Sequence, residues 1–114
     1  MLAAWLAAGK DGVAVSHESA LDLLELSDVI PDAAHVTVPR TRRNLPKLHG
    51  VKIHTTVRPL GPRDLTYRDG MVVTSPTRTI LDAAEAGVAP DQIERAVVQA
   101  VERGLAAPGE LRRG

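Results

Sequence analysis

The sequence has no cysteine, one tryptophan, one tyrosine and no phenylalanine. Without cysteine the chain has no disulfides, thiolate metal ligands or cysteine nucleophiles. Trp5 and Tyr67 alone do not make the stacking platform that binds single-stranded nucleic acid. The apolar stretch at residues 1–9 is shorter than a membrane span and lacks the basic start of a signal peptide. We therefore expect a cytoplasmic protein with no membrane partner.

The rest of the composition is that of an ordinary globular protein. The chain has 114 residues, of which 44% are hydrophobic and 25% are charged, and this suits one domain with a modest core. Its 14 basic and 14 acidic residues balance, so no overall field attracts nucleic acid or a membrane. Attraction to a charged partner must come from how the charges are distributed.

The hydrophobic periodicity changes twice along the chain. Apolar residues recur at helical spacing in four segments, 2–8, 17–26, 76–86 and 91–103. They alternate with period two in four others, 35–38, 51–57, 65–68 and 71–74. Asp69-Gly70 predicts a hairpin between the last two, and Ser16 and Ser75 are expected to cap the helices that follow them. The pattern predicts an α+β fold, with a small, mainly antiparallel sheet of about four strands and flanking helices at both ends of the chain.

Charge is segregated along the sequence. Residues 13–34 hold five acidic side chains and no basic one, namely Glu18, Asp22, Glu25, Asp28 and Asp32. Residues 39–63, the basic segment, hold seven basic side chains and no acidic one, namely Arg40, Arg42, Arg43, Lys47, Lys52, Arg58 and Arg63.

The basic segment is the part of the sequence best suited to a partner. Guanidinium forks bind phosphate oxygens in pairs, and each neutralised phosphate releases counterions. We expect contacts to DNA phosphates or to a protein partner from five side chains, Arg40, Arg42, Arg43, Lys47 and Lys52. Three other interpretations stay open: a solvated surface, pairing with the acidic segment of the same domain, and a self-complementary contact in a homodimer.

Patterns that carry catalysis or bind cofactors are weak. His35 and His54 are expected on neighbouring strands, where two imidazoles and a carboxylate could bind zinc. No motif such as H-E-x-x-H supports this, and ordinary strand histidines are favoured. Ser16 is expected to use its hydroxyl on backbone amides rather than as a nucleophile. Asp64 and Asp69, the carboxylates that a nuclease would need, fit turns better. The sequence predicts a protein that is not an enzyme, with no metal and no cofactor.

Several phrases occur together in an order that resembles one protein family. They are Val-Ser-His-Glu-Ser-Ala at 15–20, His-Val-Thr-Val-Pro-Arg at 35–40 followed by two arginines, Gly-Val-Lys-Ile-His at 50–54, and the stretch from Asp-Gly to Ile-Leu-Asp at 69–82. Together they resemble, over about residues 13–111, the domain that follows the winged helix in AbiEi-type antitoxins. Within the last phrase, Arg78 and Asp82 are four residues apart and can pair, which is worth a few tenths of a kcal/mol on an exposed helix.

This resemblance implies an operon regulator. AbiEi-type proteins are the antitoxins of type IV toxin–antitoxin and phage abortive-infection systems, and they are often transcriptional regulators. The domain in question is associated with antitoxicity and assists DNA binding, and the family offers no defined catalytic residues. The partner toxin is nucleotidyltransferase-like, and stable direct binding to it is not expected. The alternative is a protein-interaction or dimerisation module that binds no DNA.

The domain boundaries depart from the family pattern. Family members carry an N-terminal winged helix that binds inverted repeats in their own promoter, whereas only 12 residues precede Val13 here. That is too short for a winged helix, so recognition by a helix in the major groove is not expected of this chain. A helix start at Pro108 is followed by only six residues. We expect a single domain over residues 1–114 that is truncated at its C-terminal end.

Overall fold

The computed structural model describes residues 5, 13–39, 50–55, 59–107 and 109. Within them a five-stranded sheet packs with three helices, so the predicted α+β class is confirmed. The strands are β1 (Ala14–Val15), β2 (Ala34–Val38), β3 (Val51–Thr55), β4 (Leu65–Arg68) and β5 (Met71–Thr74). The helices are α2 (His17–Leu23), α3 (Pro76–Glu85) and α4 (Pro90–Glu102), and a 3₁₀ turn, η2 (Pro62–Asp64), precedes β4.

The pairing of the strands differs from the expected one. The strand order is β3-β2-β1-β5-β4. The pairs β1–β2 and β4–β5 are antiparallel, whereas β1–β5 and β2–β3 are parallel. Across the described strands the sheet is therefore mixed rather than mainly antiparallel, and it has a central strand, β1, that the sequence did not predict. Two residues are too few to show an alternating pattern, which is why β1 was missed.

The other predicted elements are present with small shifts at their ends. The β4–β5 hairpin turns at Asp69 and Gly70, whose φ angles are 52° and 78°, and two successive positive φ angles are what a type I′ turn requires. The helix predicted over residues 2–8 lies outside the described residues except for Trp5. In the described part of the chain, no helix is long and apolar enough to cross a membrane.

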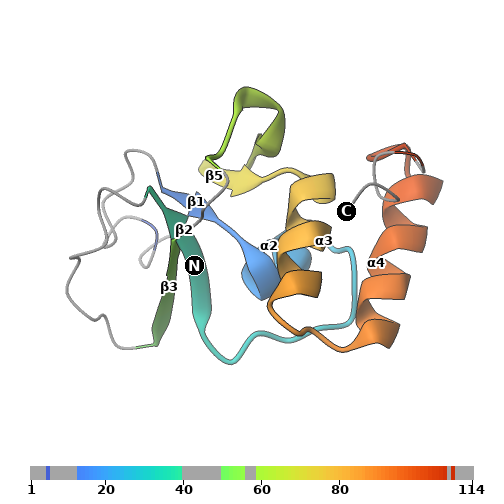
Figure 1. Ribbon diagram of the computed structural model, residues 1–114, viewed down its shortest axis with the longest axis horizontal. Coiled ribbons are helices and arrows are strands. Elements are labelled where there is room, and N and C mark those ends of the chain that lie inside the picture. Colours follow the sequence, from blue (N-terminus) through green and yellow to red (C-terminus); the bar gives the residue numbers. More distant parts are fainter. Residues whose placement is uncertain (1–4, 6–12, 40–49, 56–58, 108, 110–114) are drawn as a thin grey trace.

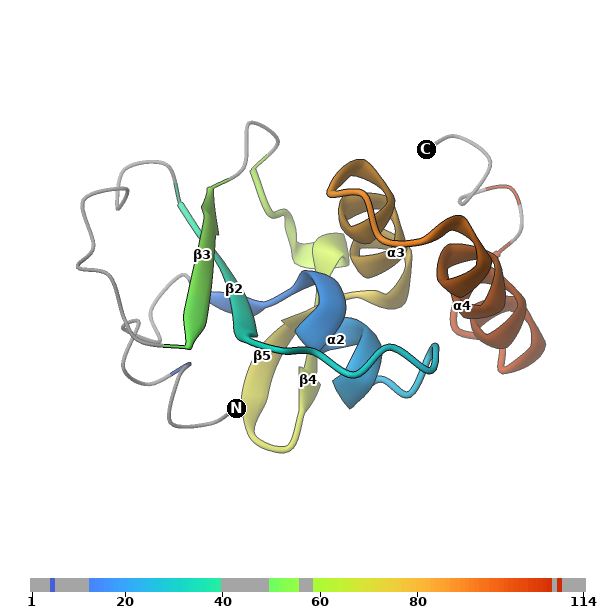
Figure 2. The ribbon, with the colours of Figure 1, turned by 90° about the horizontal axis from the view of Figure 1, so that it is seen from below.

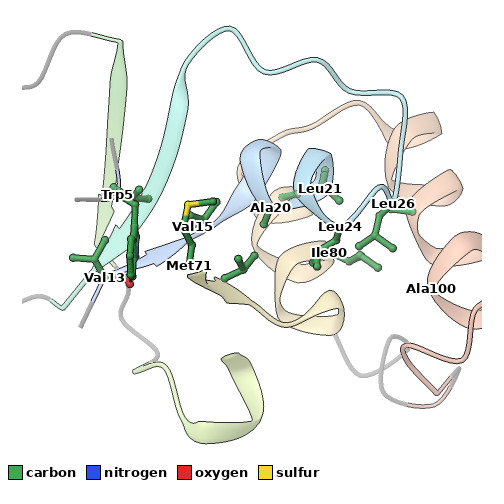
Figure 3. Close-up of a cluster of buried hydrophobic side chains, with 14 of the residues drawn as sticks. Trp5, Val13, Val15, Ala20, Leu21, Leu24, Leu26, Met71, Ile80 and Ala100 are labelled. Atoms are coloured by element: carbon green, nitrogen blue, oxygen red, sulfur yellow. The ribbon is translucent and has the colours of Figure 1, made fainter. Parts of the chain in front are cut away.

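The helices lie to one side of the strands. Figures 1 and 2 show that α2 and α3 lie beside the sheet and that α4 lies beyond α3, farthest from the strands. The hydrophobic core extends from the strands to the helices (Figure 3). Trp5 and Val13 lie at its strand end, and Leu21, Leu26 and Ala100 lie at the other end, between the helices. The indole of Trp5 also donates a hydrogen bond of 2.9 Å to the carbonyl of Val13. The packing of these apolar side chains therefore sets the positions of the strands and helices that carry the polar side chains.

Candidate functional site

One face of β2 and β3 is polar. In their parallel register His35 lies beside Lys52, and Thr37 lies beside His54. Paired residues project to the same face of a sheet, and successive residues project to opposite faces. The opposite face carries the apolar side chains of the same strands, Val36, Val38, Val51 and Ile53. The alternation in the sequence therefore places two histidines, a threonine and a lysine together.

The end of β1 brings a third histidine to this face. The amide of Ser16 donates to the carbonyl of His35 at 3.0 Å, so the chain leaves β1 alongside β2. His17 then adopts a φ of 53°, a left-handed conformation that is uncommon for residues other than glycine. Its ring stacks on that of His54 with centroids 3.8 Å apart. Nδ1 of His35 lies 2.9 Å from Nε2 of His54. We call His17, His35 and His54 the histidine cluster.

Ser16 supports the histidine cluster instead of capping α2. It occupies the N-cap position, but its side chain makes no capping hydrogen bond, which corrects the expectation from the sequence. Its hydroxyl accepts a hydrogen bond from the hydroxyl of Thr37 at 2.7 Å and lies 2.8 Å from Nδ1 of His17. Because Thr37 donates to Ser16, the Ser16 proton is free for His17. The buried Thr37 and the half-buried His17 thus contact the hydroxyl that the helix amides were expected to use.

Burial keeps the cluster neutral. Desolvation is the largest cause that lowers the pKa of His17 to about 3, and positive charge on His54, His35 or Arg78 acts in the same direction. Burial also lowers the pKa of His54, with smaller effects from His35 and Lys52. Neutral imidazoles each have one nitrogen with a free lone pair, so the cluster can accept hydrogen bonds or bind a cation.

His35 faces two carboxylates. Its side chain is 7% exposed, and its Nε2 lies 3.9 Å from a carboxylate oxygen of Glu18. That nitrogen has no hydrogen-bond partner among the described residues. One ligand atom each from Glu18, Asp32 and His35 lie within 4.8 Å of one another. Burial lowers the pKa of His35; the carboxylates of Glu18 and Asp32 oppose that shift, and Lys52 adds to it.

A second polar group, which we call the arginine cluster, consists of the buried Arg78 and Asp82 and the half-buried Asp64. The side chain of Arg78 is 7% exposed, and its Nε donates to both carboxylate oxygens of Asp82 at 3.0 and 3.2 Å. Its Nη1 lies 3.4 Å from Asp64, which also accepts the amide of Gly61 at 2.8 Å. Asp69 lies apart from this cluster, in the β4–β5 turn. Asp64 thus holds structure in place, and it is not paired with Asp69 as a nuclease would need.

The basic segment lies mostly outside the described residues. Of the five side chains predicted to contact a partner, Lys52 is described, and it is exposed on the edge strand β3. The other four fall in residues 40–49, outside the described part of the chain: Arg40, Arg42, Arg43 and Lys47. A lysine on an edge strand also discourages pairing with another sheet, so Lys52 has a structural reason to be there as well.

Part of the acidic segment is paired within the chain. Glu25 lies 3.8 Å from Arg68, and Asp28 lies 3.0 Å from Arg95. Neither arginine belongs to the basic segment. Glu25 and Asp28 therefore do not neutralise the basic segment, because each pairs with an arginine outside it.

Ser75 occupies the N-cap position of α3, and its hydroxyl accepts a hydrogen bond from the amide of Arg78 at 3.2 Å, so the cap predicted at Ser75 is confirmed.

The sequence also anticipated that His35 and His54 could approach each other. It did not anticipate that His17 and Glu18 join them, because this depends on β1 lying beside β2, nor that Asp32 does, because this depends on the path of the loop before β2. The only hint in the sequence was the run Ser-His-Glu at 16–18, and its spacing is not typical of a functional site.

The chain matches no protein-family model and no curated protein sequence. The chemistry of the site therefore has to be inferred from its geometry.

Proposed function

We propose that this chain is a non-enzymatic antitoxin and transcriptional-regulator domain of the AbiEi type. It contacts operator DNA through the basic segment and counteracts a nucleotidyltransferase-like toxin. The observation that carries the DNA contact is Lys52, exposed on the edge strand β3 inside a segment that holds seven basic residues and no acidic one. An edge strand has one open side, so a phosphate backbone can approach it without disturbing the sheet.

The internal ion pairs support this proposal. Glu25 and Asp28 are engaged by Arg68 and Arg95, which lie on β4 and α4. Two acids that could have neutralised the basic segment thus have other partners. A segment that keeps its positive charge can release counterions when it meets phosphates, and this gives affinity with little sequence preference.

The buried polar side chains favour binding over catalysis. Ser16 is fully buried and hydrogen-bonded, so its hydroxyl has no access to a substrate. Asp64 and Asp82 are both engaged by Arg78. A nucleophile or a pair of catalytic carboxylates would need to be open to substrate, and these groups serve the fold instead.

Fluorescence anisotropy on the duplex that lies upstream of the chain's own gene tests the proposal. We expect affinity that falls steeply between low and physiological salt. Replacing Arg40, Arg42 and Arg43 by Glu should abolish binding, and each lost phosphate contact should reduce the salt slope by about 0.9.

A matched pair of single variants locates the contact. Lys52→Glu and Arg95→Glu change the net charge equally, but Arg95 lies on α4, far from β3. We expect Lys52→Glu to weaken binding and Arg95→Glu to leave it nearly unchanged. Equal losses in the two variants, or no binding at low salt, would contradict a DNA contact at the basic segment. Salt-sensitive dimerisation in sedimentation would then favour the alternative, a protein-interaction module.

A further inference from the structure

Three side chains from separate parts of the fold converge on one point. Glu18 lies in the first turn of α2, Asp32 lies in the loop before β2, and His35 lies on β2. A ligand atom from each lies within 4.8 Å of the other two. Two carboxylates on a surface need no ligand, because water solvates them. The imidazole beside them is in a different situation.

The imidazole of His35 is buried with one nitrogen unpaired. Its Nε2 has no hydrogen-bond partner in the described part of the chain, and unpaired buried polar atoms are rare because nothing offsets their desolvation. Its Nδ1 lies 2.9 Å from Nε2 of His54. When Nδ1 carries the proton and donates it to His54, Nε2 presents its lone pair on the side of Glu18, whose carboxylate oxygen is 3.9 Å away.

We propose that Glu18, Asp32 and His35 bind one divalent transition-metal ion, with Zn²⁺ as the representative. Two carboxylates balance the charge of the ion, and a neutral imidazole favours zinc and its neighbours over magnesium or calcium. Tetrahedral zinc with bonds of about 2.0–2.2 Å holds its ligand atoms roughly 3.3–3.6 Å apart. The 3.9 Å separation between Glu18 and His35 therefore closes by only a few tenths of an ångström. Asp32 is exposed, so water can complete the coordination.

His54 is a positioning residue in this site. A histidine that binds a metal through one nitrogen usually donates from the other to an outer partner, which fixes its tautomer and orientation. His54 holds that place for His35. The ring of His54 is itself stacked on His17, whose Nδ1 lies 2.8 Å from the hydroxyl of Ser16, and Thr37 donates to that same hydroxyl. The histidine cluster thus supports a single metal-binding imidazole.

Lys52 opposes the metal. It lies beside His35 in the β2–β3 register, and paired residues share one face of the sheet. A positive charge so close repels a cation. Removing it should therefore strengthen metal binding severalfold. The site does not depend on the proposed DNA contact, and variants of Glu18 and Asp32 test it without touching the basic segment.

Isothermal titration of the full, chelator-treated chain with zinc chloride is the first test. We expect one equivalent to bind, and Asp32→Asn and Glu18→Gln to weaken binding at least about tenfold. The matched control is Asp22→Asn, since Asp22 is an exposed carboxylate on the same helix as Glu18, and it should bind like the native chain. Lys52→Gln should bind more tightly. Excess Mg²⁺ should not displace the zinc, because it prefers oxygen ligands alone.

Nitrogen-15 NMR of the imidazoles detects metal binding at the same site in the native chain, with all three ligand side chains present. Zinc should shift the resonance of Nε2 of His35, while Nδ1 stays protonated and bonded to His54. Three results would overturn the proposal: no saturable binding, equal affinity in Asp32→Asn and Asp22→Asn, or a metal-induced shift centred on another histidine rather than on His35.

Discussion

The histidine cluster and the arginine cluster are both polar and at least partly buried, but they are satisfied to different degrees. In the arginine cluster, the guanidinium of Arg78 is held by Asp82 and Asp64 at 3.0–3.4 Å. In the histidine cluster, His17 and His54 have partners, but Nε2 of His35 has none among the described residues. Full pairing is what a fold needs from a buried charge, whereas a neutral group with an open lone pair is suited to binding something.

The largest expected effect comes from breaking the arginine cluster. Arg78→Met should lower the free energy of unfolding by about 3–5 kcal/mol, because it removes the guanidinium that pairs with the buried carboxylate of Asp82. Urea denaturation measures this. Arg95→Met is the control, since Arg95 belongs to an exposed pair with Asp28, and it should cost less than about 1 kcal/mol. A similar loss in both variants would mean that burial does not distinguish the two ion pairs.

The second prediction concerns the support of the histidine cluster. Ser16→Ala should cost about 2 kcal/mol, because Thr37 and His17 both lose their partner in a buried site. The double variant Ser16→Ala with Thr37→Val should cost less than the two single losses combined, since they share one hydrogen bond. Thermal and urea unfolding measure both. Strict additivity would show that the hydroxyls act independently.

The third prediction is that the metal-free chain loses stability in mild acid. The unfolded chain takes up protons on its histidines below about pH 6.5, whereas burial lowers the pKa of His17 to about 3 in the native state. The unfolded state therefore binds more protons between these values, and the free energy of unfolding falls as the pH falls. The upper limit is about 1.4 kcal/mol per pH unit for each histidine, and solvent at the half-buried rings reduces it.

Urea unfolding at pH 7, 6 and 5 checks this, and His17→Gln should flatten the profile. A stability that is level from pH 7 to pH 5 would mean that the rings take up protons in the native state as readily as in the unfolded one.

The smallest effect is expected at the other serine. Ser75 makes the capping bond that Ser16 does not, so Ser75→Ala should cost about 1 kcal/mol, the usual value for a lost helix cap. Ser75→Asp should recover most of it, because Asp also caps well, whereas Ser16→Asp should not recover the loss of Ser16→Ala. Full recovery at both positions would contradict the different roles of the two hydroxyls.

Local patterns predicted most of the fold. The alternation at 35–38 and 51–57 and the turn at Asp69-Gly70 placed β2, β3 and the hairpin, because each signal lies within a few neighbouring residues. The strand β1 was missed because Ala14 and Val15 are strand residues only through their partners on β2 and β5. The mixed pairing of the sheet follows from β1 and could not be predicted without it.

The sites were predicted in part for the same reason. The alternating patterns placed His35 and His54 on neighbouring strands, so their approach could be foreseen, whereas the register that puts them on one face could not. The pairing of Arg78 with Asp82 could also be foreseen from a spacing of four residues. The burial of this pair and the contact with Asp64 depend on how η2 packs against α3. The spacing of residues in the sequence does not indicate that packing. Sequence patterns thus indicated which pairs could form, and the tertiary fold decided which became buried.

The two-residue strand β1 also sets an order in time. The β4–β5 hairpin closes across two residues and can form within microseconds, whereas pairing Val15 with Val73 closes a loop of nearly sixty residues, which is slow and entropically costly. The stacked rings of His17 and His54 need a nearer pairing, that of β1 with β2, in which Val15 pairs with Val36. Their stacking therefore marks an intermediate step in folding, and a kinetic probe placed there should lag behind one in the hairpin and precede one at the contact of β1 with β5.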